Sequence, residues 1–149
     1  MPELAEVETL KRYAKEHVLF EKIKELEIRY AFLRYPINVE ELRNNTNSSV
    51  IISAKRIAKF LILELDNFYS IVFHLGMSGR VTIKSGSHIP EKHDHVIFKF
   101  YSGKQFVFND SRRFGMIYCC KNNDLRRQNF LKNMAQEPLE DGFNADYLA

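Results

Sequence analysis

The chain has no tryptophan and only two cysteines, four prolines and six glycines among its 149 residues. The cysteines, Cys119 and Cys120, are adjacent. Neighbouring residues of a strand point to opposite faces, so a disulfide between them is not expected. The paired Cys-x-x-Cys spacing of zinc sites is also missing. We therefore expect reduced thiols in a cytoplasmic protein, and no metal or cofactor bound by this chain.

Long apolar runs are missing as well. No segment is long enough to cross a bilayer, and no apolar region precedes a cleavage site near the N-terminus. We therefore expect no membrane partner. Hydrophobic residues at 45% and charged residues at 28% are typical of a globular protein. A chain of this length can form one domain with its own core.

The positive charge is unevenly distributed. The formal net charge is only +3, but residues 51–130 hold 13 lysines and arginines against 6 acidic residues. A basic middle section fits a polyanionic partner, although solvated surface charge is the more common meaning of such a bias.

The pattern of apolar residues predicts a helix at each end of the chain and strands between them. Helical spacing covers residues 4–18, and a second helix is expected at 124–133. A short helix is predicted at 39–43, followed by a polar loop at 44–49. The predicted strands are 23–30, 50–54, 60–65, 70–75, 80–84, 95–101, 105–108 and 114–120. Short strands with tight turns indicate an α+β, mainly β domain: an antiparallel sandwich or barrel flanked by an N-terminal and a C-terminal helix.

The first residues carry a possible nucleophile. Proline at position 2 favours removal of Met1, which would leave the secondary amine of Pro2 at the N-terminus. Such an amine attacks an aldehyde-like carbon and forms an iminium ion directly. An α-amino group also titrates well below a lysine, and Glu3 could handle protons beside it. The alternative is an ordinary proline near a helix start.

Two later blocks contain residue types that can enter a DNA duplex. Met77 lies in the glycine turn His74-Leu75-Gly76-Met77-Ser78-Gly79, where an apolar side chain is unusual. It is either a wedge that unstacks bases or a side chain folded onto the core. In Asn109-Asp110-Ser111-Arg112-Arg113-Phe114-Gly115, Arg112 offers a fork of donors and Phe114 a stacking face. Taken alone, Phe114 would be a core residue at a strand start.

These three blocks, in this order, closely resemble the formamidopyrimidine-DNA glycosylase family. The resemblance implies a base-excision repair enzyme with damaged double-stranded DNA as its partner. Such an enzyme removes oxidised purines, formamidopyrimidine and 8-oxoguanine, by attack of Pro2 on C1′ and then cleaves the strand by β,δ-elimination. It also implies a monomer in a bacterial-type cytoplasm, associated with the nucleoid. The arginine block favours this branch over the sister endonuclease VIII group.

The resemblance also assigns roles to individual residues. Pro2, Glu3 and Lys59 would be catalytic, Lys59 by holding phosphate near the reacting sugar. Glu6 would face the lesion pocket. His74 and His93 would contact DNA phosphate. Met77 would be a wedge where the base has left, Arg112 would pair with the orphaned base opposite the lesion, and Phe114 would wedge beside it. His93 and His95, predicted to share one strand face, are only weak evidence for a metal site.

The resemblance has limits. Ala5 and Ser111 stand where the family usually has proline. Residues 1–136 match the catalytic N-terminal domain and 137–149 the start of a linker, whereas the helix-two-turn-helix and the zinc finger of the family are absent from this chain. One alternative is therefore a catalytically weak or inactive DNA-binding remnant of the family. A tautomerase with an N-terminal proline base is another, but it gives no reason for Met77 or the arginine block.

Overall fold

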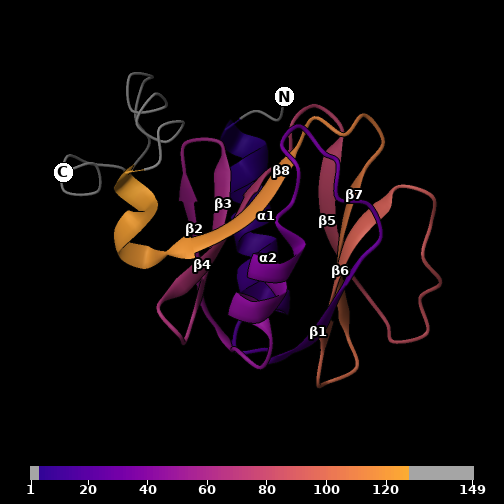
Figure 1. Ribbon diagram of the computed structural model, residues 1–149, viewed down its shortest axis with the longest axis horizontal. Coiled ribbons are helices and arrows are strands. Elements are labelled where there is room, and N and C mark those ends of the chain that lie inside the picture. Colours follow the sequence, from indigo (N-terminus) through magenta and orange to yellow (C-terminus); the bar gives the residue numbers. More distant parts are fainter. Residues whose placement is uncertain (1–3, 128–149) are drawn as a thin grey trace.

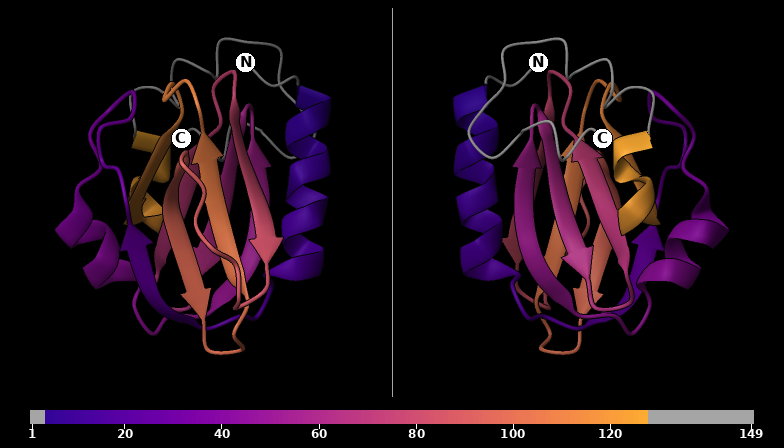
Figure 2. Two further views of the ribbon diagram at one scale, coloured as in Figure 1. Left: turned by 90° about the vertical axis from the view of Figure 1, so that its right-hand side faces the viewer. Right: turned by 90° about the vertical axis from the view of Figure 1, so that its left-hand side faces the viewer.

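The computed structural model describes residues 4–127, with side chains described from Val7 onward. Two antiparallel four-stranded sheets pack face to face, and a helix lies along each open side between them (Figures 1 and 2). The predicted fold class is therefore confirmed.

One sheet has the order β1-β6-β7-β5 and the other the order β2-β3-β4-β8. The first contains β1 (Ile23–Ile28), β5 (Gly79–Lys84), β6 (Asp94–Phe100) and β7 (Gln105–Asp110). The second contains β2 (Ile51–Ile57), β3 (Phe60–Leu65), β4 (Tyr69–His74) and β8 (Met116–Lys121). Chain connections between the sheets run from β1 to β2, from β4 to β5 and from β7 to β8.

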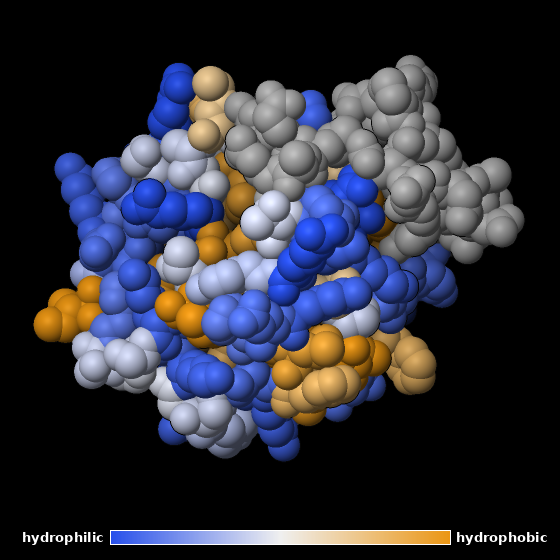
Figure 3. Space-filling view, turned by 180° about the vertical axis from the view of Figure 1, so that it is seen from behind, coloured by the Kyte–Doolittle hydropathy of each residue, from blue (hydrophilic) through white to orange (hydrophobic). Residues whose placement is uncertain are grey.

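Two helices close the sides of the sandwich. α1 (Leu4–His17) packs on β2 and β3 through Ala14, and Tyr13 accepts a hydrogen bond from the backbone of β5. α2 (Val39–Thr46) lies on the other side, against β1 and β8. Seen from the side of α1, the surface is mostly hydrophilic with separate apolar patches (Figure 3). No helix among residues 4–127 is long and apolar enough to cross a membrane.

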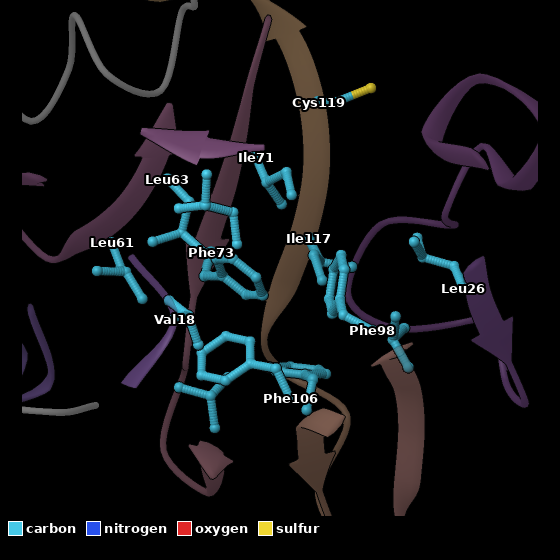
Figure 4. Packing of buried hydrophobic residues seen from close by; sticks show 14 of the residues in the cluster. Val18, Leu26, Leu61, Leu63, Ile71, Phe73, Phe98, Phe106, Ile117 and Cys119 are labelled. Carbon is cyan, nitrogen blue, oxygen red and sulfur yellow. The ribbon is translucent and has the colours of Figure 1, made fainter. Parts of the chain in front are cut away.

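The core between the sheets is aromatic at its centre. Phe73 of β4 packs against Phe98 and Phe106 of the other sheet, with ring centroids 5.8 and 6.1 Å away (Figure 4). Aromatic pairs of this geometry are stabilising beyond the area that they bury. Aliphatic side chains from α1 and from both sheets surround these rings, so each element depends on the shared core.

The outer face of the β2-β3-β4-β8 sheet holds a second, smaller cluster around Phe60, Val72 and Leu125. Cys119 belongs to the inner core and Cys120 to this outer cluster, as alternation along a strand requires. Both thiols are free and buried, and burial raises their pKa.

Most element boundaries differ from the sequence predictions by one to three residues, and two of these differences have a clear physical reason. The polar loop predicted at 44–49 is wrong in its first part, because α2 continues to Thr46. The buried Thr46 hydroxyl bonds the Leu42 carbonyl and so needs no solvent. The second helix begins at Asn122 as a 3₁₀ helix, η1 (Asn122–Arg127). The rest of that predicted helix, and the predicted linker at 137–149, lie outside the described residues.

Candidate nucleic-acid interface

All described residues with a predicted functional role lie at one end of the sandwich, which we call the upper end (top of Figure 1). Strand register requires this arrangement. His74 pairs with both Phe60 and Met116, so the β2–β3 turn, the end of β4 and the start of β8 meet there. The pairs Gly79–Asp110 and Asp94–Asn109 bring the start of β5, the end of β7 and the start of β6 to the same end.

A buried aspartate joins two turns of this end. Asp110 has no exposed surface, and its carboxylate accepts hydrogen bonds from Ser78 Oγ at 2.5 Å, Arg113 N at 3.1 Å and Gly115 N at 2.8 Å. Ser78 Oγ in turn accepts from Arg112 N at 3.0 Å. The β4–β5 turn and the β7–β8 loop are therefore held as one unit.

Two glycines allow the backbones of these turns to touch. Gly76 has a φ of +65°, and a Cβ built there would lie 2.9 Å from the Phe114 carbonyl carbon. A Cβ at Gly115 would lie 2.8 Å from the His74 carbonyl oxygen. Side chains at either position would push the turns apart, so the close approach requires glycine.

The two predicted wedge residues, Met77 and Phe114, form one exposed cluster with Arg112 on this unit, which we call the wedge cluster. Met77 is 61% exposed and Phe114 47% exposed. The Arg112 guanidinium lies 5.2 Å from the centre of the Phe114 ring, and its Nη1 lies 3.7 Å from Met77 Sδ. Met77 therefore does not fold back onto the core. Phe114 is not a core residue of β8, because the strand begins only at Met116.

His74 is a buried neutral donor rather than a cation. It is 3% exposed and stacks on Phe60, with centroids 4.9 Å apart. Burial, followed by the charges of Arg34 and Lys59, lowers its pKa to about 4. Because Gly76 N donates to Nδ1 at 3.2 Å, the ring proton is on Nε2, which can donate to a phosphate oxygen.

Lys59 lies in the two-residue turn between β2 and β3, partly buried. The preceding Ala58 adopts a left-handed conformation with a φ of 52°, which is unfavourable for alanine and fixes the direction of the turn. The next residue, Phe60, pairs with His74 on the neighbouring strand, and the charge of Lys59 helps to lower the pKa of His74. The two residues thus offer a cation and a neutral donor side by side.

The structure gives no support for a metal site at the predicted His93–His95 pair, of which only His95 lies within β6. The rings are 6.1 Å apart, and His95 Nε2 is bonded to the Asp110 carbonyl oxygen at 2.6 Å. Within residues 4–127 no group of three metal-ligating side chains was found. His93 instead lines an open hollow of about 560 Å³ beside the wedge cluster, together with Met77, Ser78, Gly79, Arg80, Glu91, Lys92, Asn109 and Ser111.

The structure adds Tyr30 and Arg113 to the site. Arg113 has a φ of 61°, and its guanidinium stacks 4.1 Å above the Tyr30 ring while Nη1 donates to Tyr30 Oη at 3.2 Å. Tyr30 also packs on His95 at 5.3 Å. The doubled arginine was a sequence signal for Arg113. Tyr30 had none, because its partner is 83 residues away.

The low pKa of His74 has a measurable consequence. A histidine whose folded pKa lies below the ordinary 6.5 stabilises the fold fully above pH 6.5, and this contribution is lost as the pH falls toward 4. We expect the free energy of unfolding to fall over that range, and His74→Gln to flatten part of the fall. Denaturant titrations at pH 7.5 and pH 5 measure the free energy of unfolding of the wild-type protein and of the variant. Equal pH dependence in both proteins would contradict a neutral buried His74.

Comparison with known proteins shows the family to which the chain belongs. Residues 1–117 match the model of the formamidopyrimidine-DNA glycosylase N-terminal domain. The chain belongs to the formamidopyrimidine-DNA glycosylase family. The formamidopyrimidine-DNA glycosylase of Rickettsia felis is 44% identical over 99% of the chain and 53% of its own length. The formamidopyrimidine-DNA glycosylase of Rickettsia bellii is 41% identical over 99% of the chain and 54% of its own length. The chain thus spans about half the length of these curated relatives.

Solved structures of the family share the fold. A complex of the Lactococcus lactis glycosylase with DNA containing an oxidised pyrimidine has a TM-score of 0.80 at 30% identity, covering 88% of this chain and 48% of the other. A complex of the same protein with DNA containing an abasic site has a TM-score of 0.80 at 29% identity, with the same coverage.

Three of the family's predicted functional positions remain predictions from the sequence alone. Pro2 and Glu3 lie outside the described residues, and so does the side chain of Glu6. The helix that follows them, α1, ends near the start of β2 at the lower end of the sandwich, where Phe20 N donates to the Ile51 carbonyl oxygen. Its first turn therefore lies at the upper end.

Proposed function

We propose that this chain is the catalytic half of a DNA glycosylase and AP lyase that acts on oxidised purines in double-stranded DNA. The observation that carries the proposal is the cluster of Met77, Arg112 and Phe114, mounted on the unit held by Asp110 and placed beside Lys59 and His74. An apolar wedge, a planar donor fork and phosphate ligands are what base extrusion needs.

The wedge and the phosphate ligands divide the task. Met77 and Phe114 occupy the space vacated by the flipped nucleotide, and Arg112 bonds the orphaned base of the opposite strand. Lys59 and the Nε2 proton of His74 hold the phosphate beside the extruded sugar. The open hollow at His93 receives a further stretch of backbone, where Arg80 and Lys92 supply positive charge.

The chemistry falls to the N-terminus. The nitrogen of Pro2 donates its electron pair to C1′, and the glycosidic bond breaks as the base leaves with the bonding electrons and takes up a proton. The C1′–O4′ bond then opens to an iminium ion, with Glu3 giving a proton to O4′. Successive loss of the two phosphate groups by β- and δ-elimination cleaves the strand.

The test is a single-turnover cleavage assay on a duplex with 8-oxoguanine. It compares the 149-residue chain with a chimera in which the chain is followed by the C-terminal half of the Rickettsia felis relative. Cleavage by the chimera, absent on undamaged duplex, supports the proposal. A chimera that binds lesion DNA but never cleaves it would instead support a DNA-binding protein without catalysis.

Lys59→Ala should weaken binding to damaged and undamaged DNA alike. A lost phosphate contact lowers the slope of log affinity against log salt by about 0.9. Affinity measured at several salt concentrations gives this slope. Lys84→Ala is the matched control, because Lys84 ends β5 at the opposite end of the sandwich. If the Lys59 variant has the same slope of log affinity against log salt as the control, Lys59 is a solvated surface charge and not a phosphate ligand.

A further inference from the structure

A single guanidinium links α1 to the turn that carries Lys59. Arg56 of β2 has a side chain only 7% exposed, and its Nε donates to Glu8 Oε1 on α1 at 2.9 Å. Its Nη1 donates to the carbonyl oxygen of Ala58 at 3.3 Å. Arg56 therefore contacts the helix and the turn at the same time.

The carboxylate partner of this arginine is itself fixed. Glu8 Oε2 lies 2.8 Å from Lys11 Nζ, one turn along α1. Hydrogen bonds from Lys11 and then Arg56 lower the pKa of Glu8 to about 2. The carboxylate is therefore ionised near neutral pH, where it can pair with Arg56.

The two ends of the link lead to the proposed reacting groups. Glu8 is six residues after Pro2. Ala58 immediately precedes Lys59, and its left-handed backbone gives the turn one direction. Hydrophobic packing also holds α1 along its length, because Val7 is buried in the first turns and Leu10 and Ala14 contact the core between the sheets. The Glu8–Arg56 pair adds a directional polar contact between the first turns of α1 and β2.

An ion pair with one buried and one partly exposed partner contributes little to stability alone, because desolvation of the buried guanidinium offsets much of the attraction. It is well suited to holding two elements in one register, because its hydrogen bonds are directional. We propose that Glu8 and Arg56 are positioning residues that hold the N-terminal amine at a set distance from Lys59. This inference rests on the proposed function of Pro2 and Lys59; neither Glu8 nor Arg56 touches DNA.

The experiment uses Glu8→Gln, Arg56→Gln and the double variant in the chimera described above. Borohydride trapping on a saturating abasic duplex gives the rate of iminium formation. Affinity is measured separately on duplex with a non-reactive abasic analogue. Misplacement of reacting groups by about 1 Å can cost up to about 100-fold in rate. We expect each single variant to be at least tenfold slower with affinity unchanged within twofold, and the double variant to be no slower than either.

The control is Glu27→Gln, which breaks the ion pair of Glu27 with Lys99, 3.0 Å apart, within the other sheet. It should keep the wild-type trapping rate. Rates equal to wild type in the Glu8 and Arg56 variants, losses that add in the double variant, or a parallel loss of affinity and rate would overturn the inference.

A second measurement separates this inference from the proposed function. Amide hydrogen exchange should accelerate in both single variants at residues 5–9 and 57–60, and remain unchanged in the β6–β7 hairpin. If the unsubstituted chimera forms no adduct, the proposed function fails, and exchange alone decides whether the pair sets the position of α1. Unchanged exchange at both segments would overturn the positioning role.

Discussion

Borohydride should trap a covalent protein–DNA adduct only when Met1 has been removed. The expected nucleophile is the secondary amine of Pro2, which becomes the N-terminus on that removal. A retained methionine would convert the proline nitrogen into an amide, whose electron pair is delocalised and cannot attack C1′. Trapping should then fall to background, a loss of several orders of magnitude. The measurement is adduct yield on an abasic duplex, with the N-terminus of each preparation verified by mass spectrometry.

Two variants sharpen this result. Pro2→Gly keeps a primary amine at the same place and should retain part of the trapping, because primary amines also form imines. Lys59→Ala keeps the amine and should reduce the adduct through weaker binding. Full trapping by a protein that retains Met1 would show that the nucleophile is elsewhere in the chain.

Asp110→Ala should be the most destabilising single change at the upper end. It removes an acceptor from Ser78 Oγ and from two backbone N–H groups, of which that of Gly115 is buried. Unsatisfied buried donors cost about 1–3 kcal/mol each. We expect the free energy of unfolding to fall by about 3 kcal/mol or more. Lesion-DNA affinity should fall too, because the two turns no longer hold the wedge cluster together.

The matched control for this change is Asp66→Ala. Asp66 also accepts a backbone hydrogen bond, from Val50 N at 3.0 Å, but it is exposed, so water can replace it. Asp66→Ala should lower the free energy of unfolding by less than about 1 kcal/mol. Denaturant unfolding of both variants gives the comparison. Equal losses of stability in the Asp110 and Asp66 variants would mean that Asp110 does not join the β4–β5 turn to the β7–β8 loop.

Strands with uninterrupted apolar runs were predicted best from the sequence. The strand at 60–65 is correct at both ends, because it is buried on both faces between turn residues. The boundary at Thr46 was wrong because Asn44 and Asn45 look like loop residues. Only the tertiary structure shows that Thr46 is fully buried and that α2 contacts β8, where Asn45 bonds Cys119 Sγ. Local propensity is overridden there by burial.

The exposed members of the site were predictable, whereas the residues that hold them were not. Met77 stands out because a large apolar side chain is unexpected in a glycine turn. Phe114 was assigned to the site only by the family resemblance, since its position alone predicts a core residue at a strand start. Asp110 was visible only as part of a loop motif, and nothing in the sequence marked it as the acceptor joining Ser78 to Gly115. The pairs Tyr30–Arg113 and Glu8–Arg56 join residues 83 and 48 positions apart. Sequence spacing carries no information about such contacts.

The contact between Gly76 and Phe114 has a mechanical consequence. Because the two turns touch backbone to backbone and share Asp110, a load applied to Met77 passes directly into the β7–β8 loop. From this loop the load reaches two pairs of hydrogen-bonded strands, one in each sheet: β4 with β8, and β5 with β7. The tip therefore has the stiffness of the whole sandwich rather than the compliance of a surface loop.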